Sequence, residues 1–157
     1  MSKKLVAVLV LLGFGFVFTV DTQAQSQLSA ADHAEIRQLY AQYNLALDSG
    51  DAEGYADVFT EDGVFGNSQG RDALIGFAEG FHAQQQGNAR HWNDNVQVAA
   101  TADGASGTCY LFLWNVGTRP ASLIVTGTYH DELVRTADGW RFKSRRVEAD
   151  TPAQSDE

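Results

Sequence analysis

The chain has 157 residues, and its 11 lysine and arginine residues against 20 aspartate and glutamate residues give a formal net charge of −9. This acidic balance argues against nucleic acid as a partner, because phosphate binding requires a basic surface. Hydrophobic residues make up 44% and charged residues 20%, which is typical of one globular domain. Cys109 is the only cysteine, so an internal disulfide and a cysteine-based zinc site are excluded, and we expect Cys109 to be buried and inert.

Residues 1–24 have the three parts of a secretory signal peptide. Two lysines precede an apolar run over residues 5–20, and small side chains follow, so cleavage is predicted after Ala24. The alternative is an uncleaved membrane anchor, but a spanning helix needs about 20 apolar residues and this run is shorter. We therefore expect a periplasmic or secreted protein without a stable membrane span, a domain over residues 25–150 and a polar tail over residues 151–157.

Three helices are predicted in the first half of this domain. Ser29 can cap a helix that ends at Gly50, because the apolar positions between them recur at helical spacing and glycine tolerates the left-handed turn after a helix. Asp51 can cap a second, shorter helix that reaches Phe59. Residues 71–82 are predicted to form the third helix.

A short strand at residues 64–65, after a turn at residues 61–63, is predicted between the second and third helices. From Arg90 onward the apolar residues alternate with a period of two, which is typical of strands. A long strand over residues 106–116 has apolar side chains on both faces, so we expect it to be central and covered on both sides. One face carries Tyr110, Phe112, Trp114 and Val116, and the other carries Cys109, Leu111 and Leu113.

The last two predicted strands, residues 123–135 and 140–147, form a hairpin around the Asp-Gly turn at residues 138–139. Helices followed by a meander of antiparallel strands indicate an α+β fold. A long sheet twists and curls, and the three helices would then close its concave side. The space between helices and sheet is where we expect a small apolar ligand to bind.

The sequence has no phosphate-binding glycine loop, no serine-hydrolase elbow and no zinc-protease motif, so acid–base chemistry remains. Tyr43 lies on the apolar face of the first helix, and Asp48 follows about 140° further around the axis. By pattern alone Asp48 is more readily explained as a solvated residue of a turn. His91 opens the first long strand, where an imidazole can transfer protons, although a lone histidine is more often exposed or hydrogen-bonded. No histidine spacing indicates a metal site.

The strand aromatics Tyr110, Trp114 and Tyr129 are most simply core residues, but one or two could line a pocket. Arg145 and Arg146 are consecutive in a strand, so one should point inward and one outward. An inward arginine needs a carboxylate partner or an anionic ligand.

Several motifs, in this order, resemble the SnoaL-like domains of the nuclear-transport-factor-2-like superfamily, whose fold is a cystatin-like α+β cone with three N-terminal helices on a curved antiparallel sheet. The matching stretches are IRQLYAQYNLALDSGD (36–51), FTEDGVF (59–65), GRDAL (70–74), RHWNDNV (90–96), GTYHDELVR (127–135), DGWRF (138–142) and RRV (145–147). The pattern is most similar to bile-acid dehydratases and scytalone dehydratase. Where scytalone dehydratase has a second catalytic histidine, this chain has Gly127 or Thr128.

This resemblance implies a cofactor-independent dehydratase or isomerase without a metal, acting on a small apolar substrate in the cone. Its catalytic residues would be Tyr43, Asp48 and His91: His91, oriented by Asp48, removes a proton, and Tyr43 donates a hydrogen bond to the developing oxyanion or leaving hydroxyl. The substrate pocket would include Tyr55, Tyr110, Trp114, Tyr129 and Arg146. Two further hypotheses are a periplasmic small-molecule-binding protein with the same cavity and no chemistry, and a homodimer formed through the open sheet face.

Overall fold

The computed structural model describes residues 27–150, so the predicted signal peptide and polar tail lie outside the described residues. The described chain contains three helices: α1 (Ala30–Ser49), α2 (Ala52–Asp57) and α3 (Arg71–Gln85). Ser29 caps α1, and Gly50 ends it in the left-handed conformation with φ 79°, as predicted. Asp51 caps α2 by accepting a hydrogen bond from the backbone N–H of Gly54.

The strands within residues 27–150 form one six-stranded sheet in the order β2-β1-β6-β5-β4-β3. All neighbouring strands are antiparallel except β1 and β6, which are parallel. The strands are β1 (Phe59–Phe65), β2 (Ser68–Gln69), β3 (Ala89–Ala100), β4 (Ala105–Asn115), β5 (Ser122–Thr136) and β6 (Gly139–Ala149).

The segment after α2 differs from the prediction. The expected turn at residues 61–63 lies inside β1, and Phe59 begins this strand instead of continuing the helix. The Val58 carbonyl accepts a hydrogen bond from the Phe142 N–H, and the Phe59 ring packs 5.5 Å from the Phe142 ring. Pairing with β6 therefore decides the conformation of this segment over its local helix preference.

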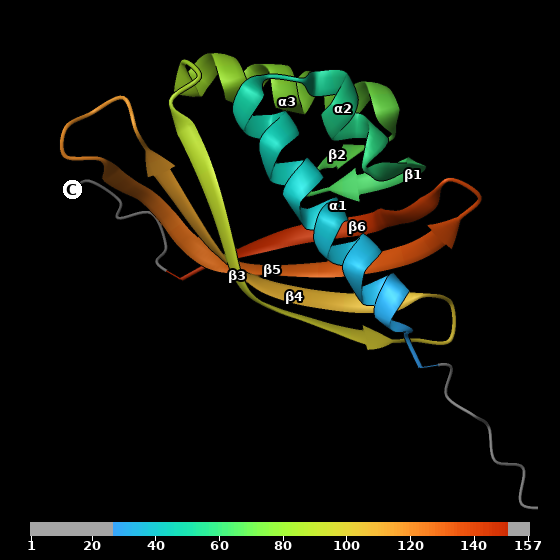
Figure 1. Cartoon of the computed structure of the whole chain (residues 1–157). Helices are drawn as coiled ribbons and strands as arrows, with labels where there is room; N and C mark the ends of the chain where they lie inside the picture. Colours follow the sequence, from blue (N-terminus) through green and yellow to red (C-terminus); the bar gives the residue numbers. More distant parts are fainter. Residues whose placement is uncertain (1–26, 151–157) are drawn as a thin grey trace, which may run out of the picture.

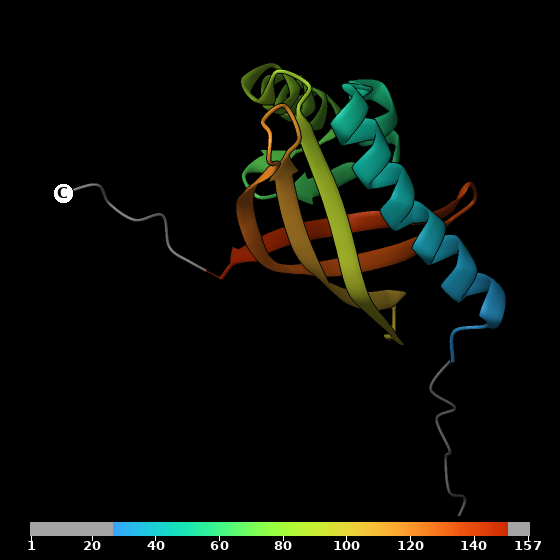
Figure 2. The same cartoon turned by 60° about the vertical axis from the view of Figure 1, so that its left-hand side comes forward.

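The helices cover one side of the curled sheet. Figure 1 shows α1 crossing the concave face, with α2 and α3 together above β1 and β2. The view in Figure 2 shows β3, β4 and β5 bending upward, with β3 next to α1, so that the sheet curls toward the helix. This is the predicted α+β cone, and its core lies between α1 and the concave face.

The two faces of β4 have different environments. Cys109, Leu111 and Leu113 are buried beneath the helices, whereas Tyr110 is 50% and Phe112 37% exposed on the convex outer face. The alternation in this strand was predicted, and β4 does lie between two other strands. The expectation that both faces are covered is wrong for a single chain, because every described helix packs on the concave side.

A bulge in the last hairpin changes which residues point inward. Leu133 pairs with Phe142, but Glu132 pairs with Ser144, so Lys143 has no opposite residue. Strict alternation from Phe142 would place Arg146 inside, and the extra residue instead turns Arg145 inward. No helix of the described chain is long and apolar enough to cross a membrane.

Candidate active site

Asp48 and His91 form a buried pair where the end of α1 meets the start of β3. Asp48 Oδ1 lies 2.6 Å from His91 Nδ1, and Asp48 Oδ2 accepts a hydrogen bond of 2.9 Å from the backbone N–H of His91. The side chains are only 11% and 3% exposed. A carboxylate at Nδ1 favours the tautomer with a proton on that nitrogen, which leaves Nε2 as the basic nitrogen. Nε2 makes no hydrogen bond to any described residue.

The local sequence explains this pairing. Asp48 occupies the last turn of α1, where its carboxylate opposes the helix dipole and requires a donor elsewhere. His91 and Asn93 are inward positions of β3, whereas Arg90 and Trp92 point outward. The donor that stabilises Asp48 is thus supplied by a strand 43 residues away. The explanation of Asp48 as a solvated turn residue is therefore wrong.

Tyr43 lies beside this pair but does not bond to it. Its ring is fully buried, 6.5 Å from the His91 ring and 5.1 Å from the Tyr55 ring. Burial, reinforced by the neighbouring Tyr55, raises the pKa of Tyr43 well above its usual value. Its hydroxyl therefore stays protonated and able to donate, and it has no hydrogen-bond partner among residues 27–150. The three predicted catalytic residues thus come together in space, with a direct contact only between Asp48 and His91.

A second buried polar cluster lies deeper in the cone. Arg145 binds Asp131 through Nε at 2.8 Å and Nη2 at 3.1 Å, and the Tyr40 hydroxyl donates to the same carboxylate. Burial alone would lower the pKa of Arg145, but the charge and hydrogen bond of Asp131, together with the neighbouring Tyr43 and Tyr129, outweigh burial and raise this pKa. The guanidinium carbon also lies 4.0 Å from the ring centroid of Tyr129 and 4.2 Å from that of Tyr43. Arg145 therefore stays protonated in a buried ion pair that lies against the Tyr43 ring.

The predicted pocket residues divide between the two sides of the sheet. Tyr55 and Tyr129 are buried on the concave side, next to Tyr43. Tyr110 and Trp114 instead lie on the outer face, where Trp114 packs edge-on against Trp92. The Arg146 side chain is 62% exposed because the β6 bulge turns it outward. The assignment of these last residues (Tyr110, Trp114 and Arg146) to a pocket inside the cone was wrong.

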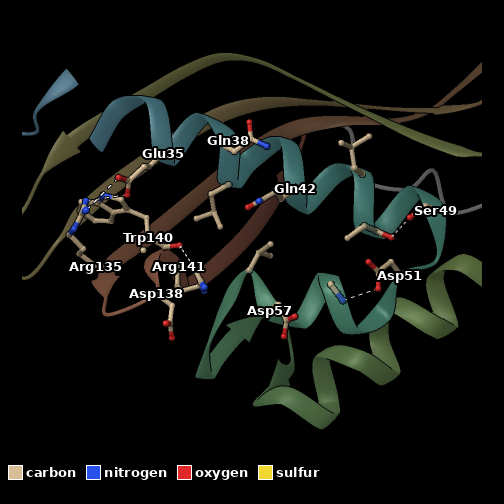
Figure 3. Close-up of a pocket in the computed structure, with 16 residues that line it drawn as sticks. Glu35, Gln38, Gln42, Ser49, Asp51, Asp57, Arg135, Asp138, Trp140 and Arg141 are labelled. Carbon is tan, nitrogen blue, oxygen red and sulfur yellow. Dashed lines mark hydrogen bonds and ion pairs between the residues drawn. The ribbon is translucent and has the colours of Figure 1, made fainter. Parts of the chain in front are cut away.

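Four surface hollows of the described chain do not include Asp48 or His91 among their lining residues. The most voluminous is about 870 Å³ and lies between α1, α2 and the β5–β6 turn. Figure 3 shows Gln38 and Gln42 of α1 on one side of it and Asp138 and Arg141 on the other. The other three hollows are about 410–470 Å³, and none of the four is lined by Tyr43, Asp48 or His91. The candidate site therefore does not coincide with any of these four hollows, including the most voluminous one.

The site consists of protein groups suited to proton transfer. Among residues 27–150, no group of three or more histidine, cysteine, aspartate or glutamate side chains is arranged to hold a metal ion. His91 Nε2 can accept a proton, and Tyr43 Oη and Arg145 Nη1 can each donate a hydrogen bond. Asp131 and Tyr40 were not singled out in the sequence. The alternation of Tyr129, Asp131 and Leu133 as inward residues of β5 was the available signal for Asp131.

The architecture is that of the cystatin-like folds of the nuclear-transport-factor-2-like superfamily. A nuclear-transport-factor-2-like protein with a cystatin-like fold from Novosphingobium aromaticivorans superposes with a TM-score of 0.70 at 27% identity, over 78% of this chain and 85% of that one. Residues 28–146 match the model of the SnoaL-like domain, and the chain belongs to that family.

Two further similarities agree with this assignment. An uncharacterized protein of Mycobacterium tuberculosis is 32% identical over 139 residues, which cover 82% of this chain and 92% of that protein. A scytalone dehydratase-like protein from Novosphingobium aromaticivorans has a TM-score of 0.67 at 22% identity, covering 81% of this chain and 96% of that one. At that identity the second similarity establishes the fold alone.

Proposed function

We propose that this protein is a cofactor-independent dehydratase or isomerase that uses the Asp48–His91 pair for acid–base catalysis on a small apolar substrate. The observation that carries the proposal is the 2.6 Å contact between Asp48 Oδ1 and His91 Nδ1 in a buried setting. A carboxylate that orients an imidazole and stabilises its protonated form is a general arrangement for proton transfer. Membership of the SnoaL-like family, which includes dehydratases and isomerases, supports the same class of reaction.

In a dehydration, His91 Nε2 removes a proton from the carbon next to a carbonyl group. The resulting imidazolium is stabilised by Asp48, and the oxyanion that forms on the carbonyl accepts a hydrogen bond from Tyr43. The carbon–hydroxyl bond then breaks, and the imidazolium returns the proton to the leaving hydroxyl, which departs as water. Returning the proton to a different carbon would give an isomerisation instead. Neither the dehydration nor the isomerisation requires an added acid, base or oxidant.

The test is turnover of a panel of β-hydroxy ketones by the wild type, His91→Gln and Asp48→Asn. Loss of a general base is expected to reduce kcat by about 10²- to 10⁴-fold. His33→Gln is the matched control, because His33 is exposed in the first turn of α1 and should retain full activity. Equal turnover in all variants would refute the proposal. Tight binding of a panel member without conversion would favour the alternative of a non-catalytic binding protein.

We also propose that a second copy of the chain covers the outer face of the sheet. The side chains that support this are large, apolar and exposed on neighbouring strands: Trp92 at 54%, Tyr110 at 50% and Phe112 at 37%. Contiguous apolar surface of this kind on a protein marks an interaction site. A homodimer formed this way leaves the concave side and the Asp48–His91 pair free.

We propose that the protein is exported to the periplasm or beyond, as the pattern of residues 1–24 suggests. Terminal sequencing of the protein recovered outside the cytoplasm should give Gln25 as its first residue. Recovery of the intact chain in the membrane fraction would instead support a retained anchor.

A further inference from the structure

Aromatic rings pack around Tyr43 and His91 of the proposed site. Five rings follow one another in a closed circuit, which we call the ring enclosure: Tyr43, Tyr55, Phe77, Phe81 and His91. Successive centroids are 5.1, 5.8, 6.2 and 5.5 Å apart, and the circuit closes with 6.5 Å between His91 and Tyr43. Phe77 and Phe81 both belong to α3, so this helix supplies the part of the enclosure that lies over His91 and Tyr55.

The buried region contains polar groups without partners. Tyr43 Oη, Tyr55 Oη and Arg145 Nη1 are buried and make no hydrogen bond within the described chain. Both tyrosines are fully buried and Arg145 is 1% exposed. Buried polar atoms are nearly always paired in folded proteins, and all three of these atoms are donors. They therefore fit a ligand whose oxygen accepts hydrogen bonds, such as a carbonyl or carboxylate on an apolar body.

Helix α3 buries fewer side chains than α1. Leu74 and Ala78 are its fully buried residues, whereas α1 buries six side chains along 20 residues. Gly76 and Gly80 lie in its interior, and a Cβ at either position would meet nothing within 4 Å in the described chain. Interior glycines lower helix stability without a packing benefit here. Gln86, which ends the helix, is held at φ 51°, a conformation that non-glycine residues rarely adopt.

The two ends of α3 are attached differently. Arg71 at its start forms ion pairs with Glu53 and with Asp57 of α2, the second at 2.6 Å. The half that carries Phe77 and Phe81 has no comparable ion pair among residues 27–150. Fully buried Leu74 also lies near the start, and beyond Gly76 only Ala78 is fully buried, with Phe77 and Phe81 half-buried. Local unfolding is expected to begin where fully buried side chains are few, so the second half of α3 should open first.

We propose that the second half of α3 is the removable cover of a ligand site, and that its local unfolding admits an apolar ligand bearing a hydrogen-bond-accepting oxygen to Tyr43, Tyr55 and Arg145. The ligand body takes the place of Phe77 and Phe81 beside His91. The identity of the site rests on the proposed function. The opening of α3 does not, and it is measured without any turnover.

The first experiment is amide hydrogen exchange on the full chain. Amides of residues 77–85 should exchange at least about 100-fold faster than the buried amides of α1. Gly76→Ala and Gly80→Ala should each slow this exchange about two- to five-fold by stabilising the helix. Gln38→Ala, at an exposed position of α1, is the control and should leave it unchanged. Exchange in α3 as slow as in α1 would overturn the proposal.

The second experiment follows modification of His91 by diethyl pyrocarbonate, detected by mass spectrometry. Phe81→Ala should raise the rate at least about ten-fold, and the two glycine variants should lower it in proportion to their effect on exchange. The glycine variants keep every packed side chain, so their effect does not depend on damage to the core. Exposed His33 in the same molecule is the internal control. An unchanged His91 rate in the glycine variants would contradict opening through α3.

The ligand class is tested with 2-naphthoate, an apolar ring system that carries a carboxylate. It should protect His91 from modification, and Tyr55→Phe should raise the concentration for half protection about ten-fold, since one donor to a charged oxygen is lost. Tyr110→Phe, on the outer face, is the matched control. Absence of protection would overturn the ligand assignment. If α3 opens but His91→Gln retains full turnover, the proposed function is refuted, and the proposal that α3 covers a ligand site still stands.

Discussion

Asp48 binds His91 through both carboxylate oxygens: Oδ2 accepts a hydrogen bond from the backbone N–H, and Oδ1 contacts the ring nitrogen Nδ1. The contact therefore anchors β3 to α1 as well as orienting the imidazole. Asp48→Ala should lower the free energy of unfolding by about 1–3 kcal/mol, because a buried donor loses its partner. Asp48→Asn retains an acceptor for the backbone N–H and should lose less.

Urea unfolding measures both variants. The control is Asp57→Ala, whose exposed ion pair with Arg71 should be worth about 1 kcal/mol or less. Equal stability of Asp48→Ala and the wild type would mean that the carboxylate anchors nothing.

The neighbouring residues Arg145 and Arg146 provide a matched pair. Arg145→Met leaves the carboxylate of Asp131 buried without its cation, and should cost about 3–5 kcal/mol of unfolding free energy. Arg146→Met changes an exposed side chain and should stay within about 0.5 kcal/mol. Chemical denaturation of both proteins checks this difference. Similar losses in both variants would contradict the inward placement of Arg145.

Cys109 should be unreactive in the native protein. Burial raises the pKa of its thiol to about 12, although Arg145 opposes this shift. At pH 8 the thiolate, which is the reactive form, should therefore be about 10³-fold scarcer than in the unfolded chain. Alkylation with iodoacetamide, followed by mass spectrometry with and without urea, measures the ratio. Equal labelling rates in the two states would show that the thiol is accessible.

Asp32 should make stability depend on pH in the acid range. Hydrogen bonds from the side chain and backbone of Ser29, then from Trp140, with the charge of Arg135, lower the pKa of Asp32 from 3.8 to about 2. A lowered folded-state pKa contributes stability above the unfolded value of 3.8, and this contribution is lost as the pH falls through about 2.

The Tm difference between the wild type and Asp32→Asn should accordingly be constant near neutral pH. It should shrink as the pH falls from about 4 to about 2. Thermal unfolding across this range measures it. Glu79→Gln, at an exposed position of α3, should show no such closing gap. A gap that persists unchanged at pH 2 would exclude the ionised carboxylate as its source.

Dimerisation through the outer face should be sensitive to charge. Tyr110→Glu places a carboxylate in the centre of the proposed interface and should convert the dimer to a monomer, because burying an unpaired charge is costly. Light scattering coupled to size exclusion measures the mass. Leu45→Glu is the control, since Leu45 is 67% exposed but lies on α1. A wild type that is monomeric at high concentration would contradict the interface.

Local sequence determined most of the fold. The Ser29 cap, the Gly50 stop and the change from helical to strand spacing near Arg90 act over a few residues, so they can be interpreted without the rest of the chain. The same is true of the Asp-Gly turn between β5 and β6. Alternation also separated the two faces of β4, because a strand has a fixed period of two.

Only the tertiary structure decided which face and which charge point inward. No local pattern distinguishes the concave face of β4 from the convex one. The extra residue at Lys143 places Arg145, instead of Arg146, inside the cone. The partners Asp131 and Arg145, like Asp48 and His91, come from separate elements and meet only when the sheet curls around α1. Sequence thus determined the elements, whereas register and curvature, which depend on pairing between distant strands, determined the site.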